Sequence, residues 1–214
     1  MLDWQNGVPI SRQFNDPYYS LADGWAETEH VFIAGNGLPE RFKPGFHIAE
    51  LGFGTGLNVL VALAAWRKLE TSGPLRFTSF EAHPLPLESV TEALAQIPGA
   101  EELRGDFLKY LAGDRTALLD LDLTLVEGDA RQKVPAWNDQ ADAWFLDGFS
   151  PAKNPELWEP ELLAAVSRAT ARDGTAATYT AAGHVRRALD AAGFAVERVP
   201  GYGRKRHMTK AVRR

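Results

Sequence analysis

The stretch Glu50-Leu51-Gly52-Phe53-Gly54-Thr55-Gly56-Leu57-Asn58 decides the fold of this chain. It follows a short apolar strand pattern at 46–49 and opens an apolar helix pattern. Glycines at alternate positions let the backbone turn sharply and approach a ligand with no Cβ in the way. The helix that follows directs its free N–H groups, the positive end of its dipole, at that ligand. The stretch therefore predicts a strand–loop–helix unit that binds a small molecule.

The acid at the strand end restricts the identity of that molecule. Glu50 is a poor neighbour for a pyrophosphate, but it suits a ligand that carries an ammonium beside its carboxylate. S-adenosylmethionine (SAM) is such a ligand, and backbone N–H groups of the loop would face its carboxylate. The residues predicted to hold it here are Glu50, Gly52, Phe53, Gly54, Thr55, Gly56 and Asn58. A nicotinamide dinucleotide is the main alternative ligand for this loop. The other alternative is a strand–turn–helix corner that contains glycine and binds no ligand.

From residue 46 onward, strand and helix patterns alternate along the chain. Strands are expected at 46–51, 75–81, 121–126, 141–146, 175–179, 194–199 and 207–213, and helices at 57–70, 86–97, 101–111, 157–171 and 182–192. Such alternation calls for a mostly parallel sheet with helices on both faces. We predict an α/β fold of the Rossmann-like, class I SAM-dependent methyltransferase type. Its seven-stranded, mostly parallel sheet would end in an antiparallel hairpin.

Residues 1–45 differ in character from residues 46–214, which form the expected methyltransferase domain. This lead-in places aromatic residues among Gly, Pro, Asn and Asp, a composition typical of turns with aromatic anchors. The density of aromatic side chains predicts a segment that packs on the core. The aromatic residues concerned are Trp4, Phe14, Tyr18, Tyr19, Trp25 and Phe32.

Composition excludes several classes of protein. The 214 residues are 45% apolar and 24% charged, as expected of one soluble domain. No stretch approaches the roughly 20 apolar residues that a membrane span needs, and the first residues do not begin a signal peptide. The absence of cysteine excludes disulfides, thiol nucleophiles and thiolate-bound metal. We therefore expect a cytoplasmic protein with no metal site and no membrane partner.

Consecutive strand patterns each finish in a carboxylate, at Glu50, Glu81, Glu127-Gly128-Asp129 and Asp147. Ligands of an open α/β sheet gather at the carboxyl ends of its strands. Glu81 lies where an acid accepts hydrogen bonds from both ribose hydroxyls. Asp129, with Ala130 beside it, is predicted to reach the exocyclic amine of adenine. Isolated strand-end acids are usually helix caps or solvated charges, which is the alternative for each residue alone.

The loop Asp147-Gly148-Phe149-Ser150-Pro151-Ala152-Lys153-Asn154-Pro155 is the candidate catalytic segment. It resembles the Asp/Asn-Pro-Pro-aromatic loop of amino methyltransferases. An alkyl amine has a pKa of about 10, by analogy with lysine, and arrives protonated at neutral pH. A carboxylate can hold that ammonium, orient it and help it lose a proton. We predict that Asp147 does this beside SAM, with Phe149 packed against the reacting group.

The chain is similar to the methyltransferase domain of the bacterial bifunctional tRNA modification enzyme MnmC and its free-standing relative MnmD. The resemblance covers nearly the whole chain and rests on residues 16–20, 52–58, 147–155 with Trp158, and 201–206. It implies SAM-dependent methylation of 5-aminomethyl(-2-thio)uridine at the tRNA wobble position, giving the 5-methylaminomethyl form. It also implies that Asp147 is the catalytic aspartate. His207 follows the basic tripeptide where the family usually carries an acid.

The resemblance also implies partners. The substrate would be the anticodon loop of a tRNA, and a flavin-dependent oxidase, fused or separate, would supply the aminomethyl group. The chain would be either free-standing or an excised domain. Cations could neutralise tRNA phosphates, and lead-in aromatics could stack on a splayed base. The residues concerned are Arg204, Lys205, Arg206 and Lys153 for the phosphates, and Tyr18, Tyr19 and Trp25 for stacking.

Two other classes of function stay open at this point. The net charge of −5 and Asp147 also suit a SAM-dependent transferase that acts on a small-molecule amine. A non-enzymatic SAM or RNA binder is the other alternative. A steep dependence of turnover on salt would distinguish a tRNA enzyme from a transferase that acts on a small amine. Loss of turnover on changing Asp147 would distinguish it from a non-enzymatic binder.

Overall fold

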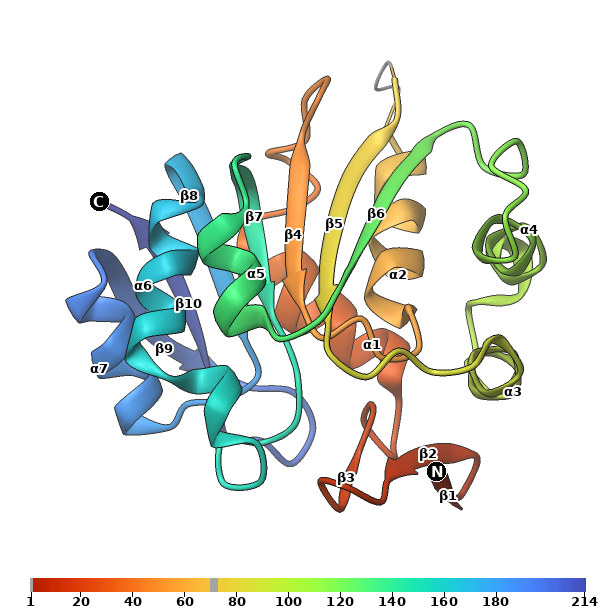
Figure 1. Ribbon diagram of the computed structural model, residues 1–214, viewed down its shortest axis with the longest axis horizontal. Helices are drawn as coiled ribbons and strands as arrows, with labels where there is room; N and C mark the ends of the chain where they lie inside the picture. The colour runs from red at the N-terminus through yellow and green to blue at the C-terminus, as the bar shows by residue number, and fades with distance from the viewer. Residues whose placement is uncertain (1, 70–72) are drawn as a thin grey trace.

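The structure is a computed structural model that describes residues 2–69 and 73–214. Figure 1 shows one large twisted sheet with helices on both faces. Its strands lie in the order β6-β5-β4-β7-β8-β10-β9. Strands β4 to β8 pair in parallel, and β10 lies antiparallel between β8 and β9. The bounds are β4 His47–Leu51, β5 Leu75–Glu81, β6 Leu121–Glu127, β7 Ala141–Leu146, β8 Thr170–Thr178, β9 Phe194–Pro200 and β10 His207–Arg213. The predicted fold class and terminal hairpin are confirmed.

The central strands are apolar on both faces because helices cover both. Along β7, Phe145 belongs to the cluster under α2, whereas Trp144 and Leu146 belong to the cluster under α5, α6 and α7. Side chains alternate between the faces of a strand, so a continuous apolar run fills two cores at once. The covering helices are α2 Leu57–Arg67, α3 Leu87–Ala95, α4 Glu101–Leu111, α5 Ala130–Ala136, α6 Pro160–Arg168 and α7 Gly183–Ala191.

Some helix boundaries differ from those predicted. The helix expected at 57–70 ends at Arg67, and its last expected position lies outside the described residues. The helix expected at 157–171 was wrong at both ends: a 3-10 turn, η3, spans Pro155–Trp158, and α6 ends at Arg168 because Thr170 already pairs with Ala141. The sequence did not predict α5, since it is only seven residues long and contains Pro135.

The lead-in has two parts with different partners. Strands β1 Leu2–Gln5, β2 Val8–Ser11 and β3 Asp16–Pro17 form a small antiparallel sheet. It lies beyond the carboxyl ends of the large sheet, at the bottom of Figure 1. The second part is helical, with α1 Gly24–Thr28, a π-helical turn η1 Glu29–Ile33 and a 3-10 turn η2 Ala34–Asn36. Val31, Phe32 and Ile33 are buried in the same cluster as Ile48 and Phe145. The helical part is therefore built into the main core.

Within residues 2–69 and 73–214, none of the helices is long and apolar enough to cross a bilayer.

Truncating Phe32 tests how far the lead-in supports the fold. Phe32 is 3% exposed, and its ring stacks on Phe145 with centroids 5.2 Å apart. We expect Phe32→Ala to lower the free energy of unfolding by about 3–5 kcal/mol in urea titrations. Leu119→Ala, at a side chain that is 81% exposed, should change it by less than about 0.5 kcal/mol. A cost for Phe32→Ala as small as that of the control would contradict the shared core.

Candidate active site

Two adjoining cavities lie at the carboxyl edge of the large sheet, with walls from this edge and from the lead-in. The first has a volume of about 770 Å³ and the second about 680 Å³. They share part of their walls, contributed by the lead-in, the glycine loop, the end of β5 and the loop after β7. The shared residues are Tyr18, Gly52, Glu81, Gly148 and Phe149. A ligand of nucleoside size in the first cavity can thus extend a substituent into the second.

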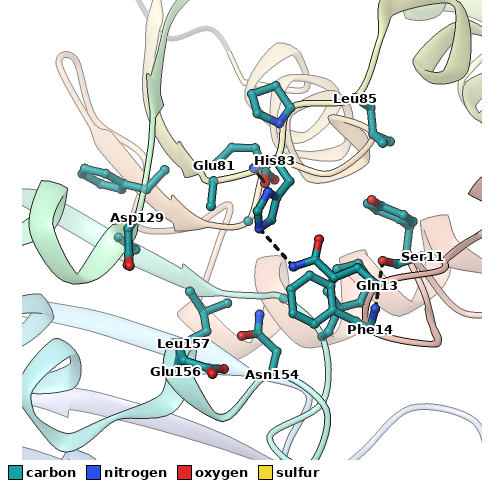
Figure 2. Close-up of a pocket in the computed structure, with 18 of the residues that line it drawn as sticks. Ser11, Gln13, Phe14, Glu81, His83, Leu85, Asp129, Asn154, Glu156 and Leu157 are labelled. Atoms are coloured by element: carbon teal, nitrogen blue, oxygen red, sulfur yellow. Dashed lines mark hydrogen bonds between the residues drawn. The ribbon is translucent and has the colours of Figure 1, made fainter. Parts of the chain in front are cut away.

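Glu81 is fixed at the boundary between the cavities. Its Oε2 accepts a hydrogen bond from the Gly54 N–H at 3.0 Å, and its Oε1 accepts one from the His83 N–H at 2.7 Å. Figure 2 shows the neighbouring His83 in contact with Gln13 of the lead-in, with His83 Nε2 and Gln13 Nε2 3.5 Å apart, on the wall of the first cavity. Carboxylate oxygens have further lone pairs, so Glu81 can still accept from vicinal hydroxyls of a ligand.

Asp129 and Ala130 line the first cavity at the start of α5. The Asp129 carboxylate caps that helix by accepting from the Arg131 N–H at 2.9 Å. It also accepts from the Arg131 guanidinium at 2.7 Å, and this partner lowers the pKa of Asp129. Asp129 therefore caps a helix, which the sequence analysis gave as the alternative for such an acid. Its contact with adenine stays a prediction.

The glycine loop needs its glycines for two reasons. Gly52 and Gly54 have φ of +83° and +54°, and both line the second cavity with Phe53 and Thr55. A Cβ on Gly56 would lie 2.8 Å from the ring of Phe107, so this glycine allows α2 to pack closely. Gly56 is not among the described residues that line either cavity.

Glu50 lies beneath the loop and does not line a cavity among the described residues. Its side chain is fully buried, and burial raises its pKa well above the usual range. The Ser79 hydroxyl donates to Oε2 at 2.6 Å, and the Asn58 amide donates to Oε1 at 2.8 Å. Direct contact between Glu50 and SAM stays a prediction; the structure shows Glu50 acting on the site through Asn58.

Asn58 connects Glu50 to the candidate catalytic residue. Its amide nitrogen also donates to Asp147 Oδ2 at 2.8 Å, and its amide oxygen accepts from the Thr28 hydroxyl at 2.9 Å. The second oxygen of Asp147 accepts from the Gly148 N–H at 2.8 Å. Burial raises the pKa of Asp147 to about 6, although both hydrogen bonds oppose the rise. Asp147 is thus a half-buried carboxylate, held by two donors, that faces the second cavity.

The loop after Asp147 is tied to the lead-in rather than free. The Asp16 carboxylate accepts from the Ser150 N–H and from the Lys153 ammonium, each at 2.8 Å. Phe149 stacks on Phe14 with ring centroids 4.6 Å apart. Lys153, predicted to contact the anticodon backbone, lines neither cavity among the described residues; its ammonium is held by the lead-in.

The other wall of the second cavity comes from the lead-in, the end of β8 and the C-terminal loop. The predicted residues Tyr19, Arg204 and Lys205 line it together with Glu27, Tyr179 and Tyr202. Sequence analysis missed Glu27 and Tyr179. Tyr179 follows β8 directly and could have been found as a strand-end residue, whereas Glu27 lies on α1 and has no such signal.

Two predicted contacts lie outside these walls. Arg206 is exposed but does not line either cavity among the described residues. Trp25 packs against the core, where its ring is 3.1 Å from the position of a Cβ on Gly99. Trp25 therefore has a packing role in this structure.

Comparison with known proteins agrees with this geometry. Residues 98–214 match the model of a family described as S-adenosyl-L-methionine-dependent methyltransferase. The chain belongs to this family. SAM is thus its cofactor, as predicted, and methyl transfer is its reaction class.

The similar proteins extend the match to the glycine loop. The chain is 44% identical over 98% of its length to the tRNA 5-methylaminomethyl-2-thiouridine biosynthesis bifunctional protein MnmC of Stutzerimonas stutzeri, and 44% identical over 99% of its length to that of Caulobacter vibrioides. It spans only 34% and 38% of those two proteins. It also resembles the crystal structure of MNMC2 from Aquifex aeolicus, with a TM-score of 0.79 and 28% identity over 95% of this chain and 66% of that one.

Removing the Asn58 bridge should give a pH-dependent loss of stability. In Asn58→Leu, Glu50 and Asp147 each lose a donor to their charged form, so the pKa of both carboxyls rises further. The variant then binds more protons than wild type above about pH 6, and its stability falls more steeply as pH rises. We expect the loss in unfolding free energy to be about 1–3 kcal/mol larger at pH 8 than at pH 5 in urea titrations.

Thr28→Val is the matched control for that experiment. It removes the hydroxyl that orients Asn58 but no donor to a carboxylate. Its cost should be the same at both pH values. Equal losses at pH 5 and pH 8 for Asn58→Leu would show that the bridge does not stabilise charge.

Proposed function

We propose that this protein is a SAM-dependent N-methyltransferase that converts 5-aminomethyl(-2-thio)uridine to 5-methylaminomethyl(-2-thio)uridine at the wobble position of tRNA. The observation that carries the proposal is the Asp147 carboxylate, held by Asn58 on the wall of the second cavity, next to the glycine loop. The MnmC relatives, whose names give them a part in the biosynthesis of this nucleoside, support the choice of substrate.

The residues present fit SAM. The first cavity offers Glu81 for ribose hydroxyls and the Asp129–Ala130 corner for adenine. Gly54 leaves room in the second cavity, beside the shared wall, since a Cβ there would lie 3.1 Å from the ring of Tyr18. The methionine part would then extend past Gly52 to the second cavity, where Asp147 lies.

The chemistry needs an unprotonated amine aimed at the methyl group. When bound, SAM supplies that methyl group, whose bond to sulfur breaks with its electron pair as the nitrogen lone pair forms the new bond. Asp147 can hold the incoming ammonium, orient its nitrogen and accept its proton, because the pKa of Asp147 is about 6 and the carboxyl is ionised at neutral pH. Tyr179 stays a phenol, since burial raises its pKa, and its hydroxyl donates to the Gly148 carbonyl at 2.8 Å.

Several arginines lie on the C-terminal elements that contribute to the second cavity, despite the net charge of −5. The pKa of His207 is lowered by desolvation first and then by the charges of Arg198, Arg206 and Arg186. Arg204 lies on the cavity wall. These arginines come from α7, β9 and the loop before β10, and they suit the phosphates that flank an extruded wobble base. A flavin-dependent oxidase, fused or separate, would supply the aminomethyl group.

Methyl transfer to a defined tRNA tests the proposal. Incubation with methyl-labelled SAM and tRNA that carries aminomethyluridine should label that nucleoside, and mass spectrometry of the digested tRNA should show it gaining one methyl group. The rate at subsaturating tRNA should fall steeply with salt, because phosphate contacts release counterions. No labelling by a folded enzyme that binds SAM would refute the proposal. Turnover of a small amine with little salt dependence would favour the alternative function.

Two substitutions separate catalysis from cofactor binding. Asp147→Asn should keep SAM affinity in calorimetry and lower single-turnover methylation by about 100- to 10,000-fold, because it removes the proton acceptor. Gly54→Val should abolish SAM binding, since φ of +54° and the Tyr18 ring leave no room for the side chain. Full activity of Asp147→Asn would exclude Asp147 as the catalytic residue.

A further inference from the structure

Lys205 behaves differently from the arginines on either side of it. Its ammonium lies 2.7 Å from Glu27 Oε1 and 4.0 Å from the centre of the Tyr179 ring. Glu27 belongs to α1, Tyr179 follows β8, and all three side chains line the second cavity with Asp147. Arg204 and Arg206 have no ion pair among the described residues. The middle cation of the tripeptide thus contacts Glu27 and Tyr179 on the cavity wall while part of its side chain stays exposed.

The pair is half inside the protein. The Glu27 side chain is 12% exposed and that of Lys205 is 43% exposed. An ion pair this close to the reacting groups is screened less than a surface pair. Asp147 responds to both charges: after burial and its two hydrogen bonds, Glu27 raises the pKa of Asp147 and Lys205 lowers it.

We propose that the Glu27–Lys205 pair is a positioning device that sets the protonation of the substrate amine beside Asp147. This inference rests on the proposed function for the identity of the amine. Glu27 and Lys205 cancel each other in the cavity, so that Glu27 adds no net negative charge beside Asp147. Two uncompensated carboxylates would hold the amine as an ammonium, which has no lone pair for methyl transfer.

The other charged groups around the second cavity do not compensate the charge of Glu27. Glu81 is held by backbone donors at the boundary with the first cavity, and Asp16 is paired with Lys153. Arg204 adds positive charge on the same side as Lys205. The tyrosines Tyr18 and Tyr19 are neutral below pH 10, because burial raises the pKa of each to about 12.

The proposal predicts shifts of opposite sign for the two partners. Lys205→Met leaves Glu27 uncompensated, so the pKa of the amine and of Asp147 both rise, and the acidic limb of the rate moves to higher pH. Glu27→Gln leaves Lys205 uncompensated, so the same limb moves to lower pH. Each shift should be roughly half a unit to one unit, and the double variant should return close to wild type.

Single-turnover methylation of saturating tRNA from pH 5.5 to 9 measures this limb in the bound complex. A carbon-detected NMR titration of the Asp147 carboxyl in the enzyme alone, assigned by its loss in Asp147→Asn, gives a second readout that does not depend on tRNA. Opposite shifts in this titration support the proposed role of the ion pair whether or not the tRNA is methylated. Failure to methylate the tRNA would refute the proposed function alone. Lys205→Arg keeps the cation and should keep the wild-type midpoint.

Two controls distinguish this role from others. Lys210→Met removes a cation paired with Glu197 at 3.0 Å on the β9–β10 hairpin and should move neither midpoint. Arg206→Met should weaken tRNA binding and lower its salt dependence without moving the midpoint. The proposal is overturned if Lys205→Met and Glu27→Gln shift the limb in the same direction or not at all. It is equally overturned if Lys205→Met behaves like Arg206→Met.

Discussion

The site depends on one amide that serves two carboxylates. Glu50 is fully buried and Asp147 is half-buried, and burial alone would drive both toward their neutral forms. Asn58 donates to each of them at 2.8 Å, and its carbonyl faces the Thr28 hydroxyl, which leaves its amino group in one orientation. The glycine loop places Asn58 in the first turn of α2 so that the bridge can form. Strand β4, helix α2 and the end of strand β7 are thereby joined at the candidate catalytic residue, Asp147.

Segments near the two ends of the chain supply the cavity walls that the sheet edge does not provide. Asp16 holds the loop after β7 through Ser150 and Lys153, and Glu27 meets a lysine 178 residues away. The lead-in is thus a wall of both cavities, while its helical part is core. The sheet edge thus holds the candidate catalytic carboxylate, and the lead-in and the C-terminal loop supply the other walls of its cavity.

Sequence patterns predicted the elements well where periodicity and strand-end position carried the signal. Glu81, Asp129 and Asp147 do gather at one edge, because parallel strands end together. The pattern could not tell where each side chain points: Glu50 is directed inward to Ser79, and Asp129 caps its own helix. Glu27 could not be found at all, since its place on the cavity wall comes from tertiary packing of α1 and not from any local motif.

The carboxylates and the cations of this protein lie in different parts of the structure. An acidic interior suits a cationic donor and an amine substrate, whereas a polyanionic tRNA needs cations outside. In line with the proposed function, the charges of Arg198, Arg206 and Arg186 add to desolvation in lowering the pKa of His207 on the hairpin, whereas Asp147 lines the second cavity. Lys205 lies where the two regions meet, paired inward with Glu27. The net charge of −5 is therefore compatible with the proposed RNA substrate, because Asp147 lines a cavity whereas Arg204 and Arg206 are exposed.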